Sequence, residues 1–122
     1  MLETLGIEFT ELGTDFLRLR MPVDHRTRQP YGVLHGGASC VLAETAGSTA
    51  GNLCLEAKKQ FCYGLSIQTN HIKTIKEGYI TATARPIHLG KTTQVWEIDI
   101  RDEKEQLISI NRLTNIIMIR EM

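Results

Sequence analysis

The chain has 122 residues, and its 14 basic and 14 acidic side chains give a formal net charge of zero. This length predicts a single domain over residues 1–122, and the balanced charge offers no basic surface for a nucleic-acid backbone. The longest uncharged stretch is broken by glycines and polar residues, so we expect no membrane span, and the N-terminal sequence MLETLGIEF lacks a secretion signal.

The first predicted elements are two short strands. Residues 5–11 and residues 15–21 read as β-like runs, the second alternates apolar and polar side chains, and Leu12-Gly13-Thr14 separates them. We therefore expect an N-terminal hairpin. The polar residues 24–28 predict a surface loop. Gln29 precedes a proline, which keeps Gln29 extended and places the start of any helix further along the chain.

Small and apolar residues from Gly36 to about residue 55 predict one long helix. Between Arg28 and Glu56 the only side chain with a formal charge at neutral pH is that of Glu44. A helix that is small or apolar nearly all round is expected to be buried. A buried carboxylate must be paired, neutral or functional, so Glu44 is the first candidate for a chemical role.

Helical spacing divides this segment into two faces. Glu44 shares one face with the small residues Gly37, Cys40, Val41, Gly47, Ser48 and Gly51, and the other face, expected against a sheet, carries Ala38, Leu42, Ala46, Thr49 and Leu53. The free N–H groups where the helix begins suit a carbonyl oxygen that becomes an anion. Glu44 stands about 12 Å along the axis from that end.

The remainder of the chain predicts four strands. They cover residues 63–75, 79–87, 92–101 and 106–120, with tight turns at 76–78, 88–91 and 102–105. Tight turns predict antiparallel neighbours, and only the long helix can cover the apolar face of such a sheet. We therefore expect an α+β fold in which the sheet curls around the helix. Its open edges favour a dimer, with a tetramer as a further possibility.

Three cysteines, Cys40, Cys54 and Cys62, complete the composition. Their odd number and irregular spacing argue against a disulfide framework and favour a reducing cytoplasm. The sequence contains no pair of cysteines or histidines at metal-binding spacing, so we expect neither a metal site nor a cofactor.

One segment, MPVDHRTRQPYGVLHGGASCVLAETAGSTAG, together with GLSIQTNH, ARPIHLGKTTQVWEIDI and INRLT, resembles the bacterial hotdog acyl-CoA thioesterases. The likeness covers nearly the whole chain and is greatest to the branch of 1,4-dihydroxy-2-naphthoyl-CoA hydrolase and the 4-hydroxybenzoyl-CoA type. A quite specific motif is HGG at residues 35–37, followed eight residues after the histidine by Ala43 and then by the acid, Glu44. Members often carry an extra N-terminal helical segment, whereas this chain is expected to begin almost directly at its first strand.

The resemblance implies a role for each position that matches the family motif. Glu44 is implied to be the catalytic carboxylate, as nucleophile or as general base. The backbone N–H of Gly36 is implied to polarise the thioester carbonyl with His35 beside it, Gln29 to contact that carbonyl or the water, and Ser48 to orient water or the acid. His71 is implied to complete the site of the neighbouring subunit.

Contacts to the acyl-CoA substrate are also implied by the resemblance. They fall on a glycine in the first strand after the helix, on the end of that strand and on a later turn: Gly64, His71, Ile72, Lys73, Thr74, His88, Leu89, Gly90, Lys91, Thr92 and Thr93. Lys73, Arg85 and Lys91 could contact the phosphates of coenzyme A or could equally be ordinary strand-edge charges.

Other interpretations remain open from the residues alone. Cys40 could be a nucleophile, but a buried helical cysteine is usually an apolar filler. His35 could be a general base rather than part of the carbonyl site. The whole chain could be an acyl-CoA-binding module without activity, or a hotdog dehydratase or hydratase. His25 is expected to be a solvated loop residue, and Trp96 a core residue.

Overall fold

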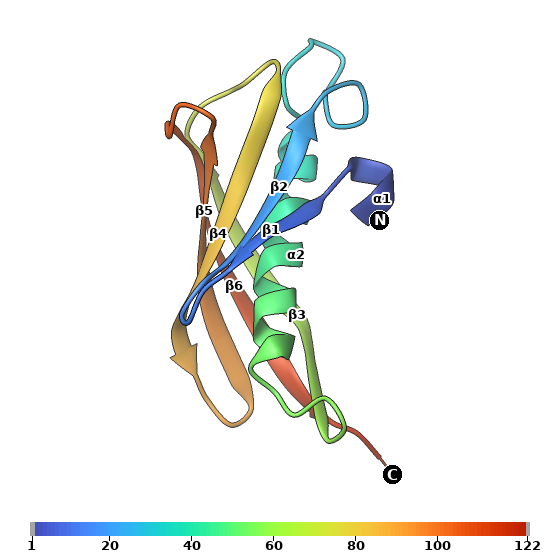
Figure 1. Cartoon of the computed structure of the whole chain (residues 1–122), viewed down its shortest axis with the longest axis vertical. Helices are drawn as coiled ribbons and strands as arrows, with labels where there is room; N and C mark the ends of the chain where they lie inside the picture. The colour runs from blue at the N-terminus through green and yellow to red at the C-terminus, as the bar shows by residue number, and fades with distance from the viewer. Residues whose placement is uncertain (1, 122) are drawn as a thin grey trace.

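The computed structural model describes residues 2–121, in which one six-stranded sheet curls around one long helix (Figure 1). In chain order the elements are α1 (Leu2–Leu5), β1 (Glu8–Leu12), β2 (Leu17–Val23), α2 (Gly36–Leu53), β3 (Gln60–His71), β4 (Gly78–Leu89), β5 (Thr93–Asp102) and β6 (Leu107–Ile119). The predicted α+β architecture, an antiparallel sheet wrapped around a helix, is confirmed. One difference is α1, a short helix in front of the first strand.

The core lies between α2 and the concave face of the sheet. The β4 and β5 residues predicted to share one face are all buried: Ile80, Ala82, Ala84, Trp96, Ile98 and Ile100. Small helix residues let the sheet approach closely, because a Cβ atom at Gly47 would lie 2.5 Å from the side chain of Leu113. Each large apolar side chain buried in this layer contributes about 1.5–3 kcal/mol.

The order of the strands differs from the predicted one. It is β1-β2-β4-β5-β6-β3, so β3 pairs with β6 and not with β4. The predicted turn at residues 76–78 is the end of a connection that leaves the sheet edge and enters the sheet again beside β2. Hydrogen bonds from the Ile72 N–H to the Ile108 carbonyl and from the Leu34 N–H to the Ile75 carbonyl hold this connection. The prediction was wrong because a short connection was taken as a hairpin.

β3 is an edge strand of 12 residues that ends at His71 rather than at residue 75. A bulge between Gly64 and Ser66 shifts its register against β6. Leu65 is 60% exposed, whereas Ile67 packs against the core. An unbroken strand would place both residues on one face, but a bulge inserts one extra residue and breaks the alternation.

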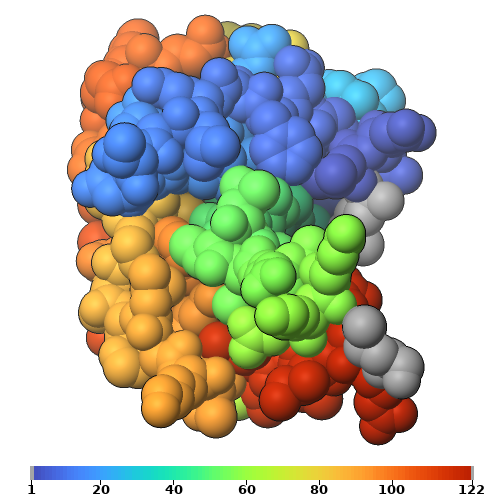
Figure 2. Space-filling model, turned by 60° about the horizontal axis from the view of Figure 1, so that its bottom comes forward, coloured from blue at the N-terminus to red at the C-terminus, as the bar shows by residue number. Residues whose placement is uncertain are grey.

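α2 is enclosed on one side only, so the prediction of burial nearly all round was wrong. Its buried stripe shares Leu42 and Ala46 with the predicted sheet-facing stripe but is rotated toward the predicted Glu44 face: Ser39, Leu42, Ala43, Ala46, Gly47, Ala50 and Gly51. Figure 2 shows the end of α2 and the following connection, in green, at the surface between the β1–β2 hairpin, in blue, and the β4–β5 turn, in orange. The helix therefore presents one stripe to the sheet and leaves the other open.

Candidate active site

The first turn of α2 carries an unpaired backbone donor. His35 is the N-cap residue, with φ −71° and ψ 128°, and its Nδ1 accepts a hydrogen bond from the Gly37 N–H at 2.8 Å. The N–H groups of Ala38 and Ser39 donate to the His35 carbonyl. The Gly36 N–H has no acceptor among residues 2–121. It lies at the positive end of the helix dipole, where a partial negative charge is favoured.

The loop before α2 holds this turn in place from two sides. The His35 N–H donates to the Thr27 carbonyl at 2.7 Å, and the Leu34 N–H donates to the Ile75 carbonyl at 2.8 Å. Thr27 is 1% exposed, and its hydroxyl donates to the Pro22 carbonyl at 2.9 Å. The predicted surface loop at residues 24–28 therefore contains one buried anchor. A polar sequence gave no signal for it.

Asp24 stabilises the same loop. Its carboxylate accepts hydrogen bonds from the backbone and the guanidinium of Arg26. The Arg26 side chain lowers the pKa of Asp24 to about 2.

Gln29 lies in this loop, is half-buried, and its side chain folds back onto the loop backbone. Its Oε1 accepts a hydrogen bond from the Tyr31 N–H, and its own N–H donates to the Val33 carbonyl at 2.8 Å. The remaining NH₂ group of the amide makes no side-chain hydrogen bond within residues 2–121. Gln29 therefore keeps donors for a ligand.

Glu44 lies eight residues after Gly36, on the open side of α2. It is exposed in the single chain, so the expectation that it is buried was wrong. Its carboxylate rests against β3: a Cβ atom added to Gly64 would lie 2.7 Å from Glu44 Oε2. The Glu44 carboxylate therefore packs directly on Gly64, where only a glycine leaves room for it. The sequence did not indicate this contact.

Ser48 follows Glu44 by one helical turn. Its hydroxyl donates to the Glu44 backbone carbonyl, so in this rotamer it contacts the backbone and not the carboxylate. Cys40 donates from its sulfur to the Thr69 hydroxyl at 3.4 Å and does not contact His35. This arrangement gives no support to a Cys40 nucleophile.

His71, the last residue of β3, lies over the start of α2. A Cβ atom at Gly36 would be 2.9 Å from His71 Nε2 of the same chain. His71 and Gly36 therefore form one unit, and this contact within one chain was not expected. Whether the unit also serves a neighbouring subunit stays a prediction.

Apart from Gly64, which lies against Glu44 in β3, the predicted acyl-CoA contacts fall into two separate groups. Residues 71–74 lie at the start of the β3–β4 connection, and residues 88–93 surround the β4–β5 turn at the opposite end of the sheet (Figure 1). The 12-residue strand β4 lies between them and spans about 40 Å. The single chain therefore does not bring the two groups together.

An open, mostly apolar hollow of about 670 Å³ lies beside the start of α2. It is lined by Thr4, Leu5, His35, Gly37, Ala38 and Val41. The hollow adjoins the unpaired Gly36 N–H through His35 and Gly37, so an apolar group could lie there while an attached carbonyl faces the helix terminus.

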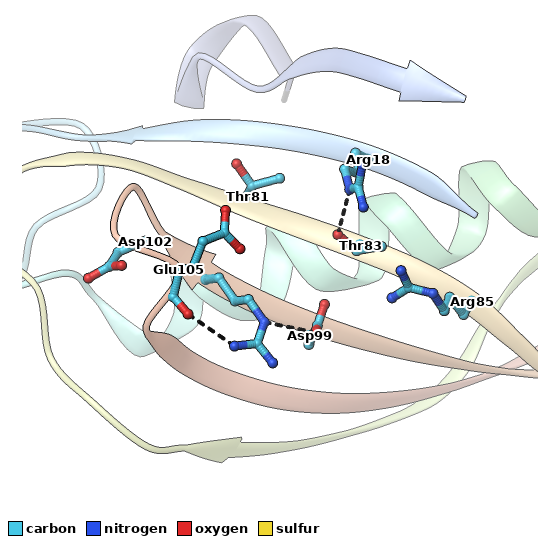
Figure 3. Close-up of a pocket in the computed structure, with 8 residues that line it drawn as sticks. Arg18, Thr81, Thr83, Arg85, Asp99, Asp102 and Glu105 are labelled. Atoms are coloured by element: carbon cyan, nitrogen blue, oxygen red, sulfur yellow. Dashed lines mark hydrogen bonds and ion pairs between the residues drawn. The ribbon is translucent and has the colours of Figure 1, made fainter. Parts of the chain in front are cut away.

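A second, polar hollow lies on the outer face of the sheet (Figure 3). Of its charged side chains, Arg101 pairs with Asp99, and Arg18 pairs with Glu11 outside the hollow. Its residues alternate with core residues along β2, β4 and β5, so they point away from α2. This hollow is therefore not part of the candidate site.

No helix within residues 2–121 is both long and apolar enough to span a membrane. No three of the His, Cys, Asp and Glu side chains in this range gather closely enough to hold a metal ion.

The comparisons with known proteins agree with this geometry. Residues 31–109 match the model of the thioesterase superfamily. The chain is 48% identical over 118 residues to the 1,4-dihydroxy-2-naphthoyl-CoA hydrolase of Escherichia coli, which covers 97% of this chain and 86% of that protein.

Solved structures give the same result. A thioesterase of Haemophilus influenzae matches with a TM-score of 0.94 at 50% identity, over 97% of this chain and 82% of that one. A Staphylococcus aureus thioesterase, solved as a variant with one glutamate replaced by alanine, matches with a TM-score of 0.94 at 41% identity, over 98% of both chains. It was also solved with one glutamine replaced by alanine.

These relatives are thioester hydrolases, and none of the reported names supports a binding module or a dehydratase. The free N–H at a helix start, the carboxylate on the same helix and the apolar hollow beside them occur on the fold that these enzymes share. The chain is a thioester hydrolase with the hotdog fold, and it belongs to the thioesterase superfamily.

Proposed function

We propose that this enzyme hydrolyses the thioester of an aromatic or otherwise bulky acyl-CoA, with 1,4-dihydroxy-2-naphthoyl-CoA as one candidate. The observation that carries the proposal is that one helix presents both an unbonded N–H, at Gly36, and a carboxylate on its open side, at Glu44. The name of the Escherichia coli relative and the apolar hollow beside His35 support a bulky acyl group.

Gly36 supplies the carbonyl site in this proposal. A thioester carbonyl gains negative charge as a nucleophile attacks, and an N–H fixed at a helix start stabilises that charge without reorganisation. His35 Nδ1 already accepts from Gly37, so the neutral ring carries its proton on Nε2. His35 is therefore a donor toward the substrate and not a general base.

Glu44 supplies the attack on the carbonyl carbon. As a nucleophile, it forms an acyl anhydride and expels the CoA thiolate, and water then hydrolyses the anhydride. As a general base, it takes a proton from a water molecule that attacks directly. Both routes consume one water and yield the acid and the CoA thiol.

Gln29 is proposed to contact the carbonyl or the water through its free NH₂ group. In the Staphylococcus aureus protein, the glutamate and the glutamine that were replaced lie fifteen residues apart in that chain's numbering. Gln29 and Glu44 have the same separation. The equal spacing supports the assignment of these two residues as a pair.

A shared site between two subunits follows from the length of α2. Eight residues separate Gly36 from Glu44, about 12 Å along the axis, which is too far for both to contact one carbonyl group. A second copy, joined through the free edge of β3, would bring its Glu44 to the Gly36–His71 unit. It would also bring the two predicted CoA-contact groups together. We propose at least a homodimer, and a tetramer by further pairing of dimers.

Replacement of Glu44 is the first test. Glu44→Gln and Glu44→Ala should lower kcat by at least a thousandfold, because either change removes the nucleophile or base, while circular dichroism and the urea midpoint stay close to wild type. Thr45→Ala is the matched control at the next position of the helix and should keep its activity. A Glu44→Ala enzyme with near-normal turnover would show that Glu44 is neither the nucleophile nor the general base.

Labelled water separates the two routes. In a single turnover in ¹⁸O water, attack by Glu44 followed by hydrolysis at the Glu44 carbonyl puts the label into Glu44. Direct attack by water puts the label into the released acid alone. Mass spectrometry of the peptide that contains Glu44 distinguishes the two.

Mixed subunits test the shared site. Glu44→Ala and His71→Ala chains should each be poorly active alone. After reversible dissociation and mixing, a heterodimer has one site with both defects and one with neither, so activity should partly return. A fully active monomer by light scattering at the assay concentration would contradict the shared site.

A panel of acyl-CoA substrates tests the acyl group. Release of free thiol should be fastest with aromatic and bulky acyl groups. Activity limited to short straight-chain substrates would overturn this part of the proposal and leave thioester hydrolysis intact.

A further inference from the structure

Asn52, in the last turn of α2, joins the helix to β3 through two hydrogen bonds and makes a third within the helix. Its Nδ2 donates to the carbonyls of Ser48 and Cys62, each at 2.9 Å. Its Oδ1 accepts from the Cys62 N–H, also at 2.9 Å. The amide thus pairs with both peptide groups of Cys62 as a neighbouring strand would. We call this arrangement the Asn52 clamp.

Both segments that the clamp joins, α2 and β3, lead within a few residues to the candidate catalytic carboxylate of Glu44. Along α2, Asn52 follows Ser48, which follows Glu44, at intervals of one turn. Along β3, Gly64 follows Cys62 by two residues and packs against Glu44, where an added Cβ would lie 2.7 Å from Oε2. The clamp therefore fixes the helix to the strand at Cys62, two residues before Gly64, on which the carboxylate rests.

Other contacts of α2 do not replace the clamp. Gln94 and Asn115 donate to the carbonyls of Gly51 and Gly47, but these side chains come from β5 and β6. Within residues 2–121, the other side-chain hydrogen bonds between α2 and β3 pass through sulfur, at 3.4 Å from Cys40 and 3.9 Å from Cys62. Sulfur is a weak donor. In the single chain β3 has a neighbouring strand, β6, on one side only, and at Cys62 the clamp supplies the hydrogen bonds on its other side.

We propose that Asn52 is a positioning residue for Glu44. The clamp keeps Gly64 under the carboxylate, and loss of the clamp lets β3 move away, so that the carboxylate samples positions from which it does not reach the reacting carbon. Small misplacements of a reacting group lower the rate of the chemical step more than they weaken substrate binding. The inference rests on the proposed role of Glu44.

Three variants of Asn52 test the proposal. Asn52→Asp keeps the shape but loses the donor and places a charge beside two carbonyl oxygens. Asn52→Ser keeps a hydroxyl that can bond to Ser48 but cannot reach both groups of Cys62. Asn52→Ala removes all three bonds. We expect each to lower kcat about tenfold with KM changed less than twofold, and Asn52→Asp to be the most impaired although it is isosteric.

Gln60→Glu is the matched control. It makes the same amide-to-carboxylate change at the first residue of β3, which has no side-chain hydrogen bond within residues 2–121, and it should keep the wild-type kcat. Rates are divided by the folded fraction from urea titration, so that lost stability is not counted as lost catalysis. If one variant does not fold, Asn52→Ser, the mildest of the three, decides the result.

Hydrogen exchange tests the clamp without any activity assay. The Cys62 amide should exchange at least tenfold faster in Asn52→Ala than in the wild type, whereas the Leu113 amide in β6 should be unchanged. Unchanged exchange at Cys62, or a wild-type kcat per folded molecule in Asn52→Asp, overturns the proposal. Failure of the proposed function would look different, since Glu44→Ala would then retain its activity while the exchange result still held.

Discussion

Backbone groups hold the N-terminal end of α2, where Thr27 and Ile75 accept from His35 and Leu34, and the Gly36 N–H is left without an acceptor among residues 2–121. Side-chain amides hold the C-terminal end, where Asn52, Gln94 and Asn115 donate to helix carbonyls. The N-terminal end thus keeps a donor available, whereas at the C-terminal end side-chain amides occupy the carbonyls of Gly47, Ser48 and Gly51. A helix with the proposed carbonyl site at one end can be secured at the other without loss of the free donor.

Gly36→Ala should produce the largest effect at the N-terminal end. The new Cβ would lie 2.9 Å from His71 Nε2, so the imidazole must move and the carbonyl site changes shape. We expect kcat/KM to fall about a hundredfold, or about 2.7 kcal/mol of transition-state stabilisation, while the urea midpoint stays close to wild type because a flexible side chain can yield. A marked loss of stability with normal kcat/KM would contradict the comparison.

A glycine-to-alanine substitution at the C-terminal end of α2 should lower stability rather than activity. In Gly51→Ala the Cβ would meet Gln94 Oε1 at 2.3 Å, Asn115 Nδ2 at 2.6 Å and Cys62 Sγ at 2.8 Å. These groups are buried and bonded to one another, so they cannot move without losing partners. Urea unfolding should show a loss of about 1–3 kcal/mol, the usual result of overpacking. An unchanged midpoint would mean that the amides repack freely.

The smallest effect concerns pH and the loop before α2. The Arg26 side chain lowers the pKa of Asp24 to about 2 in the folded protein, below the ordinary value of 3.8. The ionised carboxylate therefore stabilises the folded state above pH 4, and this contribution is lost as the pH falls through 2.

Asp24→Asn tests that sign. Its free energy of unfolding should lie below that of the wild type at pH 6, and the two should converge near pH 2. The difference should stay below about 1 kcal/mol because the Asp24–Arg26 pair lies near solvent. Curves that remain parallel over this range would show that the carboxylate adds nothing to the loop.

Much of the fold was predictable because its patterns are local. The alternation of Ile80, Ala82 and Ala84, and the single uncharged run from Gly36, follow directly from strand and helix periods. Pairing between distant strands has no local signal, which is why the position of β3 was wrong. The bulge after Gly64 was missed for the same reason, since one inserted residue leaves the composition of a strand unchanged.

The candidate site was predictable to a lesser degree. Glu44, His35 and Gly36 were found because one acid in an uncharged run and a glycine pair at a helix start are visible in the sequence. The burial of Thr27, the contact of His71 with Gly36 and the pairing of Asn52 with Cys62 depend on which segments meet in space. A polar residue in the last turn of an otherwise small and apolar helix was the only available sign of Asn52.

Asn52 also determines how much of the β3 edge another molecule can use. A strand that adds to an open edge bonds to alternate residues along it, and at Cys62 both peptide groups are already occupied. An added strand can therefore extend along the part of β3 toward His71 but must stop before Cys62. The Asn52 side chain therefore also shortens the exposed edge of β3 that strands of other molecules could pair with during aggregation.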